Sequence, residues 1–209
     1  MAAALPFAAA VNGALRRVPV WAVWLLALVP LGALVGQAVS GNLGPDPVRT
    51  LERGIGRHAL QLIVATLAVT PLRRFTGISL VRFRRALGLL AFLYVVVHLI
   101  VWVTLDLQFR WDEIAADLTR RPFIIVGMAG LVVMLPLAVT SNAASIRAMG
   151  AAAWRRLHRL TYVAGIAGAL HFVLLSKVWA GDSLVYAGLI IALLAVRLIP
   201  EPGARRAPA

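Results

Sequence analysis

Long apolar segments alternate with short polar segments along the whole chain. A helix needs about 20 apolar residues to cross the hydrocarbon core of a bilayer. With this window the pattern predicts an all-α fold, a polytopic transmembrane helix bundle with about six spans. The spans are expected at residues 18–39, 54–72, 86–105, 122–140, 157–176 and 183–199. Residues 1–17 form a separate N-terminal segment in this interpretation, and residues 200–209 form a short tail.

The first predicted span also has features of a secretory signal peptide. Arg16 and Arg17 precede an apolar centre that ends in small residues. The apolar part is longer than the roughly 7–15 residues of a typical signal peptide. We therefore expect a retained membrane anchor, with a cleaved signal peptide as the alternative.

The composition excludes several classes of function. The chain is 61% hydrophobic and 14% charged, whereas soluble domains carry about 25% charged residues. The formal net charge is +13, but the basic residues lie between apolar spans, so we expect contact with membrane lipid and no nucleic-acid partner. The chain has no cysteine, which excludes disulfides, thiolate metal sites and thiol catalysis.

The charges predict the orientation of the bundle. Lys and Arg are enriched in cytoplasmic loops, and basic residues without acids occupy every second connection. Seven of the eight acids fall in the other connections, which we expect to be periplasmic loops, including residues 106–121. Both termini are therefore expected in the cytoplasm, and the protein in the bacterial inner membrane. The basic residues behind this prediction are Arg16, Arg17, Arg73, Arg74, Arg82, Arg84, Arg85, Arg147, Arg155 and Arg156.

Two of the four histidines are predicted at matched depth inside the membrane. At 1.5 Å per residue, His98 lies about 18 Å and His171 about 20 Å from the cytoplasmic ends of their helices. Gly88 and Ala91 lie on the helix face of His98, and Ala164 and Gly168 on that of His171, so there is room for a flat ligand. We expect a heme with His98 and His171 as axial ligands. Close helix packing and a hydrogen bond between helices are the alternative explanation for such residues.

His158 and His58 are interpreted differently. Thirteen residues separate His158 from His171, so the two histidines differ in depth and in helix face and cannot serve one site. His158 lies among arginines that can bind heme propionates or a flavin phosphate. Contact with lipid of the inner leaflet is the alternative explanation for these arginines, and the one we favour. His158 is either a second ligand or an interfacial hydrogen-bonding group. His58 is expected near the start of the second span, at the periplasmic surface, as an interfacial residue without a role as a ligand. Ligation at the outer site is the alternative.

Several segments carry a resemblance to a known family. The segments are "LGPDPVRTLERGIGRHALQLIVATLAVTPLRR", "RRALGLLAFLYVVVHL", "RRPFIIVGMAG", "LAVTSNAASIRAMGAAAWRRLHRLTYV" and "ALHFVLLSKV". Together they resemble the MsrQ (YedZ) family of the ferric-reductase-like transmembrane group. The resemblance implies that 18–199 is a six-helix heme-binding domain with a b-type heme on His98 and His171, and that His158 is a third functional histidine. It also implies bound FMN, electrons from the quinone pool and a periplasmic partner, the molybdenum-cofactor methionine-sulfoxide reductase MsrP.

The function expected from these observations is transmembrane electron transfer that supports repair of oxidised periplasmic proteins. No catalytic residue is assigned, and we expect no sulfoxide-reducing site in this chain, because it lacks a cysteine nucleophile and an evident molybdenum ligand. A heme-containing ferric or metal reductase is the alternative. A proton-coupled transporter fits less well, because the acids are expected only in loops.

Overall fold

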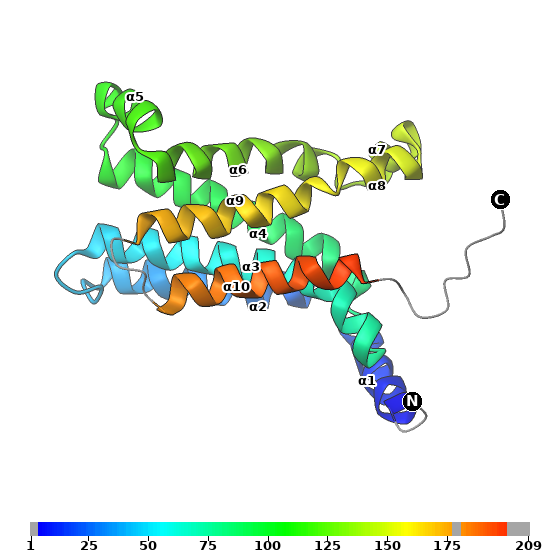
Figure 1. Cartoon of the computed structure of the whole chain (residues 1–209). Helices are drawn as coiled ribbons and strands as arrows, with labels where there is room; N and C mark the ends of the chain where they lie inside the picture. Colours follow the sequence, from blue (N-terminus) through cyan, green and yellow to red (C-terminus); the bar gives the residue numbers. More distant parts are fainter. Residues whose placement is uncertain (1–3, 177–180, 200–209) are drawn as a thin grey trace.

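The computed structural model describes residues 4–176 and 181–199. Six of its helical segments are long and apolar enough to cross a membrane, which confirms the predicted number of spans. These segments run side by side (Figure 1). They are α2 (Val20–Val39), α3 (Pro47–Thr76), α4 (Arg84–Val101) with a π-helical turn (Trp102–Asp106), α6 (Pro122–Val139), α8 (Ala151–Leu157) with α9 (Leu160–Leu175), and α10 (Gly181–Ala195) with a 3₁₀ turn (Val196–Leu198).

The α3 helix is longer than the sequence predicted. It begins at Pro47, after Asp46, whose side chain accepts a hydrogen bond from the backbone N–H of Arg49. It ends at Gly77, which adopts a left-handed conformation with φ 75°. The apolar window missed the first turns because they contain several charged residues, although a proline at N1 and an aspartate cap are good helix starts.

The predicted loops contain further helices. The N-terminal segment forms α1 (Ala4–Arg17), which lies with the end of α10 at one end of the bundle (Figure 1). The connection at the other end contains α5 (Trp111–Arg120), and the one before His158 contains α7 (Ala143–Met149) and α8. We call the end with α5 the outer end and the end with α1 the inner end, following the predicted orientation. The predicted tail, 200–209, lies outside the described residues.

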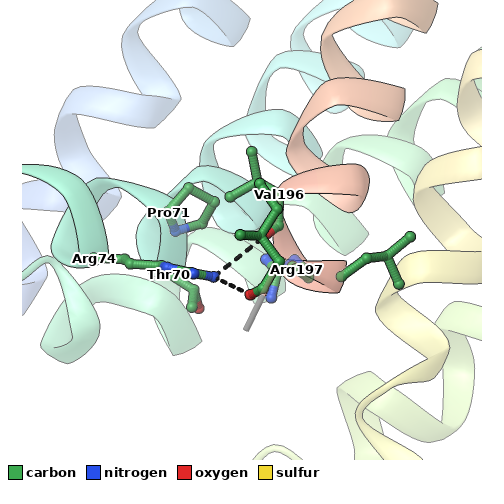
Figure 2. Close-up of a pocket in the computed structure, with 7 residues that line it drawn as sticks. Thr70, Pro71, Arg74, Val196 and Arg197 are labelled. Atoms are coloured by element: carbon green, nitrogen blue, oxygen red, sulfur yellow. Dashed lines mark hydrogen bonds between the residues drawn. The ribbon is translucent and has the colours of Figure 1, made fainter. Parts of the chain in front are cut away.

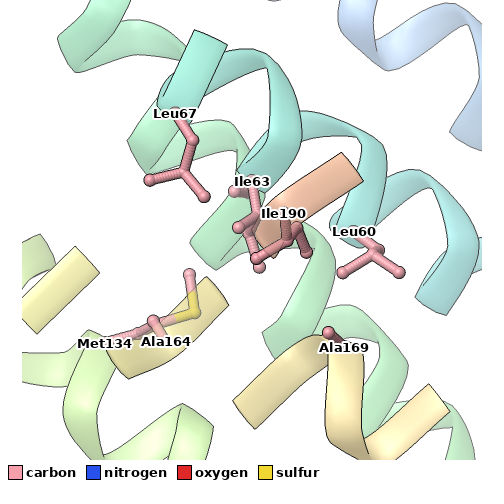
Figure 3. Packing of buried hydrophobic residues seen from close by; sticks show 8 residues of the cluster. Leu60, Ile63, Leu67, Met134, Ala164, Ala169 and Ile190 are labelled. Atoms are coloured by element: carbon pink, nitrogen blue, oxygen red, sulfur yellow. The ribbon is translucent and has the colours of Figure 1, made fainter. Parts of the chain in front are cut away.

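The main core lies where α3, α4, α6, α9 and α10 meet. Figure 3 shows Leu67, Met134 and Ile190 pointing toward one another from three of these helices. Gly165 lies close to α3, since a β-carbon there would be 3.0 Å from Leu67 Cδ1. This packing holds α9 against α3. The helix that carries His171 is thereby fixed within the bundle.

The α3 and α10 helices are parallel and keep one register along their length. Arg57 pairs with Asp182 at 3.2 Å, and Gln61 donates a hydrogen bond to Tyr186 one turn further inward. At the inner end, Arg74 donates to the carbonyl oxygens of Val196 and Ile199 (Figure 2). Residue pairs 57–182, 61–186 and 74–199 all have the same offset, so polar contacts fasten both ends of this seam.

Candidate functional site

His98 and His171 come together near the outer end of the bundle. His98 projects from α4 and His171 from α9, and their ring centres are 6.2 Å apart with an angle of 82° between the ring planes. Both side chains are half-buried. The structure therefore brings together the two histidines that the sequence predicted as a pair.

Backbone carbonyls fix the tautomers of both rings. His98 Nδ1 lies 3.0 Å from the carbonyl oxygen of Glu52, and His171 Nδ1 lies 2.6 Å from that of Phe123. A carbonyl oxygen only accepts, so Nδ1–H must be the donor in each case. The Nε2 atoms consequently carry the lone pairs. Histidines that bind metals through one nitrogen usually donate the other N–H in this manner.

Two glycines make room for these rings. A β-carbon at Gly127 of α6 would lie 2.8 Å from His171 Nδ1, and one at Gly56 of α3 would lie 3.2 Å from His98 Nδ1 and Cε1. Real β-carbons are almost never found as close as the first of these distances. Each histidine is therefore held between a carbonyl and a glycine of the same neighbouring helix, which restricts its ring orientation.

The separation of the rings fits one metal atom between them. Metal–imidazole bonds are about 2.0–2.1 Å long and the ring centre lies about 1 Å beyond the nitrogen, so two axial imidazoles have centres about 6 Å apart. No group of three or more His, Asp or Glu side chains that can hold a bare ion occurs in the described residues. Two imidazoles suit heme iron, because the macrocycle supplies its other four ligands.

A cavity of about 500 Å³ lies further toward the inner end. Its walls near the membrane interior include the small residues Gly88, Ala91 and Ala164, which the sequence placed on the faces of His98 and His171. Gly168 instead packs toward α3, where a β-carbon would be 3.3 Å from Leu60 Cδ1. Some of the small residues predicted beside the two histidines thus line this inner cavity, and Gly168 instead allows close packing of two helices.

Arginines surround the inner mouth of this cavity. They come from α4 and from the α8–α9 region, and none of the described carboxylates lines the cavity. An anion in it would meet several guanidinium groups and no described acid, while an apolar ring would meet the apolar wall. The arginines are Arg84, Arg85, Arg155 and Arg159, and His158 also lines the cavity.

His158 lies at the break between α8 and α9, where its ring makes both a stacking contact and a hydrogen bond. Its ring stacks on Trp154 with centres 3.8 Å apart, and its Nε2 lies 3.1 Å from Thr140 Oγ1. The Thr140 hydroxyl hydrogen already goes to the carbonyl of Pro136, at 2.6 Å. Nε2–H of His158 is therefore the donor, which is the opposite tautomer from that of His98.

His58 lies further along its helix than the sequence predicted. His58 lies eleven residues after Pro47 within α3, and its Nδ1 is 2.8 Å from Gln61 Oε1. Its ring also packs edge-on against Tyr94, with centres 6.1 Å apart. The difference follows from the early start of α3, which the charged residues of its first turns concealed.

The expectation that acids occur only in loops was wrong. Glu52 lies in the second turn of α3, and its backbone carbonyl binds His98. Asp112, Glu113 and Asp117 belong to α5, where Asp117 is 6% exposed and pairs with Arg121 at 2.8 Å. The sequence did not point to Glu52, Phe123, Gly56 or Gly127, because carbonyl contacts and ring clearance depend on helix pairing.

Comparisons with known proteins show the family to which this chain belongs. Residues 55–169 match the family model described as "Ferric reductase like transmembrane component". The chain is 44% identical over 191 residues to a Brucella anthropi protein named "Protein-methionine-sulfoxide reductase heme-binding subunit MsrQ", covering 90% of this chain and 86% of that protein. Proteins of the same name from Brucella ovis and Brucella canis are 44% identical over 181 residues, covering 85% of this chain and 82% of each relative. The chain belongs to the MsrQ family.

Membership of the MsrQ family, together with six apolar helices, makes the chain a multi-pass membrane protein, consistent with the bacterial inner membrane. The ferric-reductase-like match includes His98 and His158 and ends two residues before His171. The relatives' name describes a heme-binding subunit of a protein-methionine-sulfoxide reductase.

Proposed function

We propose that this chain carries electrons from quinol through a b-type heme, held by His98 and His171, to a periplasmic methionine-sulfoxide reductase subunit of the MsrP type. The supporting observation is the 6.2 Å separation of two imidazoles whose Nδ1 atoms donate to carbonyls. When bound, the heme supplies a one-electron carrier. The chain itself holds the ring orientations through the Nδ1 hydrogen bonds, which leave both Nε2 atoms with their lone pairs.

FMN is proposed to bind in the inner cavity. Its phosphate would meet Arg84, Arg155 and Arg159, and the apolar wall near Ala91 suits a flat ring. His158 remains a candidate iron ligand by resemblance, but its bond to Thr140 favours a hydrogen-bonding role. A ligand role would require Nδ1 or a broken Thr140 contact.

The position of the histidine pair supports the proposed direction of electron flow. The pair lies beside α6 near its first residue and close to α5, at the end of the bundle that the charges predict to be periplasmic. An acceptor outside the membrane can therefore approach it closely. The reductase subunit would contain the molybdenum cofactor and carry out the sulfoxide reduction, which supports repair of oxidised periplasmic proteins.

Reconstitution in liposomes tests this proposal. The purified protein is mixed with a reduced quinone, the purified periplasmic reductase and a methionine sulfoxide substrate. We expect heme to be reduced by quinol and reoxidised only when the reductase and the sulfoxide are both present. Heme that stays reduced under these conditions would contradict the proposal.

A metal reductase is the second candidate, because the matched family model carries a ferric-reductase description. The same liposomes distinguish it: reoxidation by a ferric chelate alone, at the rate seen with the periplasmic reductase and sulfoxide, would favour metal reduction. A purified protein without any heme absorption would instead favour the proton-coupled transporter.

The orientation itself can be measured with single cysteines, since the natural chain has none. A cysteine replacing Ala116 of α5 is expected to react with a membrane-impermeant thiol reagent added from the periplasmic side, because the charge pattern places this segment there. A cysteine replacing Ala153 of α8 should react only from the cytoplasmic side. The reverse labelling pattern would overturn the proposed direction of flow.

A further inference from the structure

A polar cluster on the outer half of the α3–α10 seam has no part in the histidine pair or in the arginine-lined cavity. It consists of His58, Gln61 and Tyr186. His58 Nδ1 lies 2.8 Å from Gln61 Oε1, and Gln61 Nε2 donates to the Tyr186 hydroxyl at 2.8 Å. This polar cluster lies one turn inward from the ion pair of Arg57 and Asp182.

The hydrogen bonds of the polar cluster leave complementary groups open. Oε1 of Gln61 accepts, so Nδ1–H of His58 is the donor and its Nε2 is an acceptor. The Tyr186 oxygen accepts from Gln61, so its own hydrogen is available as a donor. Among the described residues, neither His58 Nε2 nor the hydrogen of the Tyr186 O–H has a hydrogen-bond partner. One acceptor and one donor therefore lie on adjacent parallel helices.

The polar cluster lies on the outside of the helix bundle. Gln61 is exposed, and His58 and Tyr186 are half-buried, within two helices that are long and apolar enough to cross a membrane. Polar side chains exposed to hydrocarbon are costly and are typically functional. A ligand for them must be soluble in the membrane and carry both a hydrogen-bond donor and an acceptor. It must also reach side chains of two neighbouring helices at once.

The polar cluster is also close to the histidine pair. The His58 ring packs against Tyr94, and Tyr94 precedes His98 by four residues on α4, which is about one helical turn or 6 Å. A redox-active ring bound at the cluster would thus lie near the ligand histidines without entering the inner cavity.

We propose that His58, Gln61 and Tyr186 form a binding site for a quinol headgroup that enters from the lipid. His58 Nε2 accepts a hydrogen bond from one quinol hydroxyl, and the Tyr186 hydroxyl or the second Gln61 N–H donates to a quinol or quinone oxygen. The site rests on the proposed function, in which quinol is the electron donor, and it assigns the place where that donor binds.

The experiment uses the heme-loaded protein in phosphatidylcholine nanodiscs and decylubiquinol as the probe. The rate of heme reduction is measured against quinol concentration, and binding of the oxidised quinone is measured separately by equilibrium partition. Tyr186→Phe and His58→Leu should each raise the quinol concentration for half-maximal rate and the quinone dissociation constant about tenfold, as expected for one lost hydrogen bond. The dithionite-reduced spectrum should stay unchanged.

Tyr94→Phe is the matched control. The Tyr94 hydroxyl binds only backbone atoms of α2, the carbonyl of Ala27 and the N–H of Leu31, and its ring contact with His58 survives the change. Equal quinol and quinone constants in the wild type and both cluster variants would overturn the site, as would the same increase in Tyr94→Phe. If dithionite reduces the wild-type heme but quinol does not, the proposed function fails. The quinone dissociation constants of the wild type and the variants still decide whether the binding site exists.

Discussion

His98 and His158 lie in the same bundle, but their hydrogen bonds leave opposite ring nitrogens free. Near the outer end, His98 and His171 donate Nδ1–H to carbonyls of neighbouring helices, so each Nε2 keeps its lone pair. At the inner end, His158 donates Nε2–H to Thr140 and stacks on Trp154. The same residue type is thus prepared for metal ligation in one region and for hydrogen bonding in the other.

The second difference between the two regions is charge. The outer pair is held by carbonyls and glycines, with no arginine among the contacts that fix its rings. The inner cavity is lined by four arginines. This contrast suits an iron between two neutral imidazoles at one end and an anionic ligand at the other. A substitution in one of these regions should therefore leave the ligand of the other region in place.

The largest effect is expected from removal of the outer imidazoles. His98→Ala and His171→Ala should each lower heme affinity by more than about a hundredfold, because an axial ligand and its orienting carbonyl contact are both lost. Heme content per protein and the reduced-minus-oxidised spectrum measure the effect. His158→Ala should retain the six-coordinate low-spin spectrum of the outer site. Loss of that spectrum in His158→Ala, but not in the other two variants, would reverse the assignment.

Crowding the rings should have the next largest effect. Gly127→Ala places a methyl group against His171 and should lower heme affinity by about 10- to 100-fold, the range found when partners of ligand histidines are disturbed. Gly56→Ala should cost less, because its nearest contact is longer, 3.2 Å against 2.8 Å. Gly32→Ala is the control, since nothing lies within 4 Å of a β-carbon at that position. Equal heme content in all three variants would show that the rings are not restricted as described.

The inner cavity should respond to loss of positive charge. Arg84→Gln should weaken FMN binding by about tenfold or more, because charge-assisted hydrogen bonds contribute roughly 1.5–3 kcal/mol. Flavin released from the purified protein is quantified by fluorescence. Arg147→Gln on α7 is the matched control, since Arg147 does not line the cavity. A loss of outer-site heme together with flavin would mean that the two regions are not independent.

The smallest effect is expected at the threonine that binds His158. Thr140→Val removes the acceptor of Nε2–H and should destabilise the protein by about 1 kcal/mol, measured as a lower thermal midpoint in detergent. Thr119→Val is the control, because that hydroxyl binds only carbonyls within exposed α5. The heme spectrum should stay unchanged in both variants. A new or altered heme signal in Thr140→Val would indicate that His158 ligates iron.

The sequence alone determined the class of the molecule. Six apolar segments specify six spans because the thickness of the bilayer core sets the length of an apolar helix. The pairing of His98 with His171 was also predictable, since equal distances along helices that run in the same direction give equal depths. The family followed from segments distributed over most of the chain.

The tertiary structure decided everything that depends on which helices are neighbours. The carbonyls of Glu52 and Phe123, and the clearance at Gly127, belong to helices far from the histidines in sequence, so no local pattern indicates them. The tautomer of His158 depends on a threonine eighteen residues away, at the other end of the connection that contains α7 and α8. Periodicity and hydropathy report burial along one helix, whereas ring orientation and the free nitrogen are set by contacts between helices.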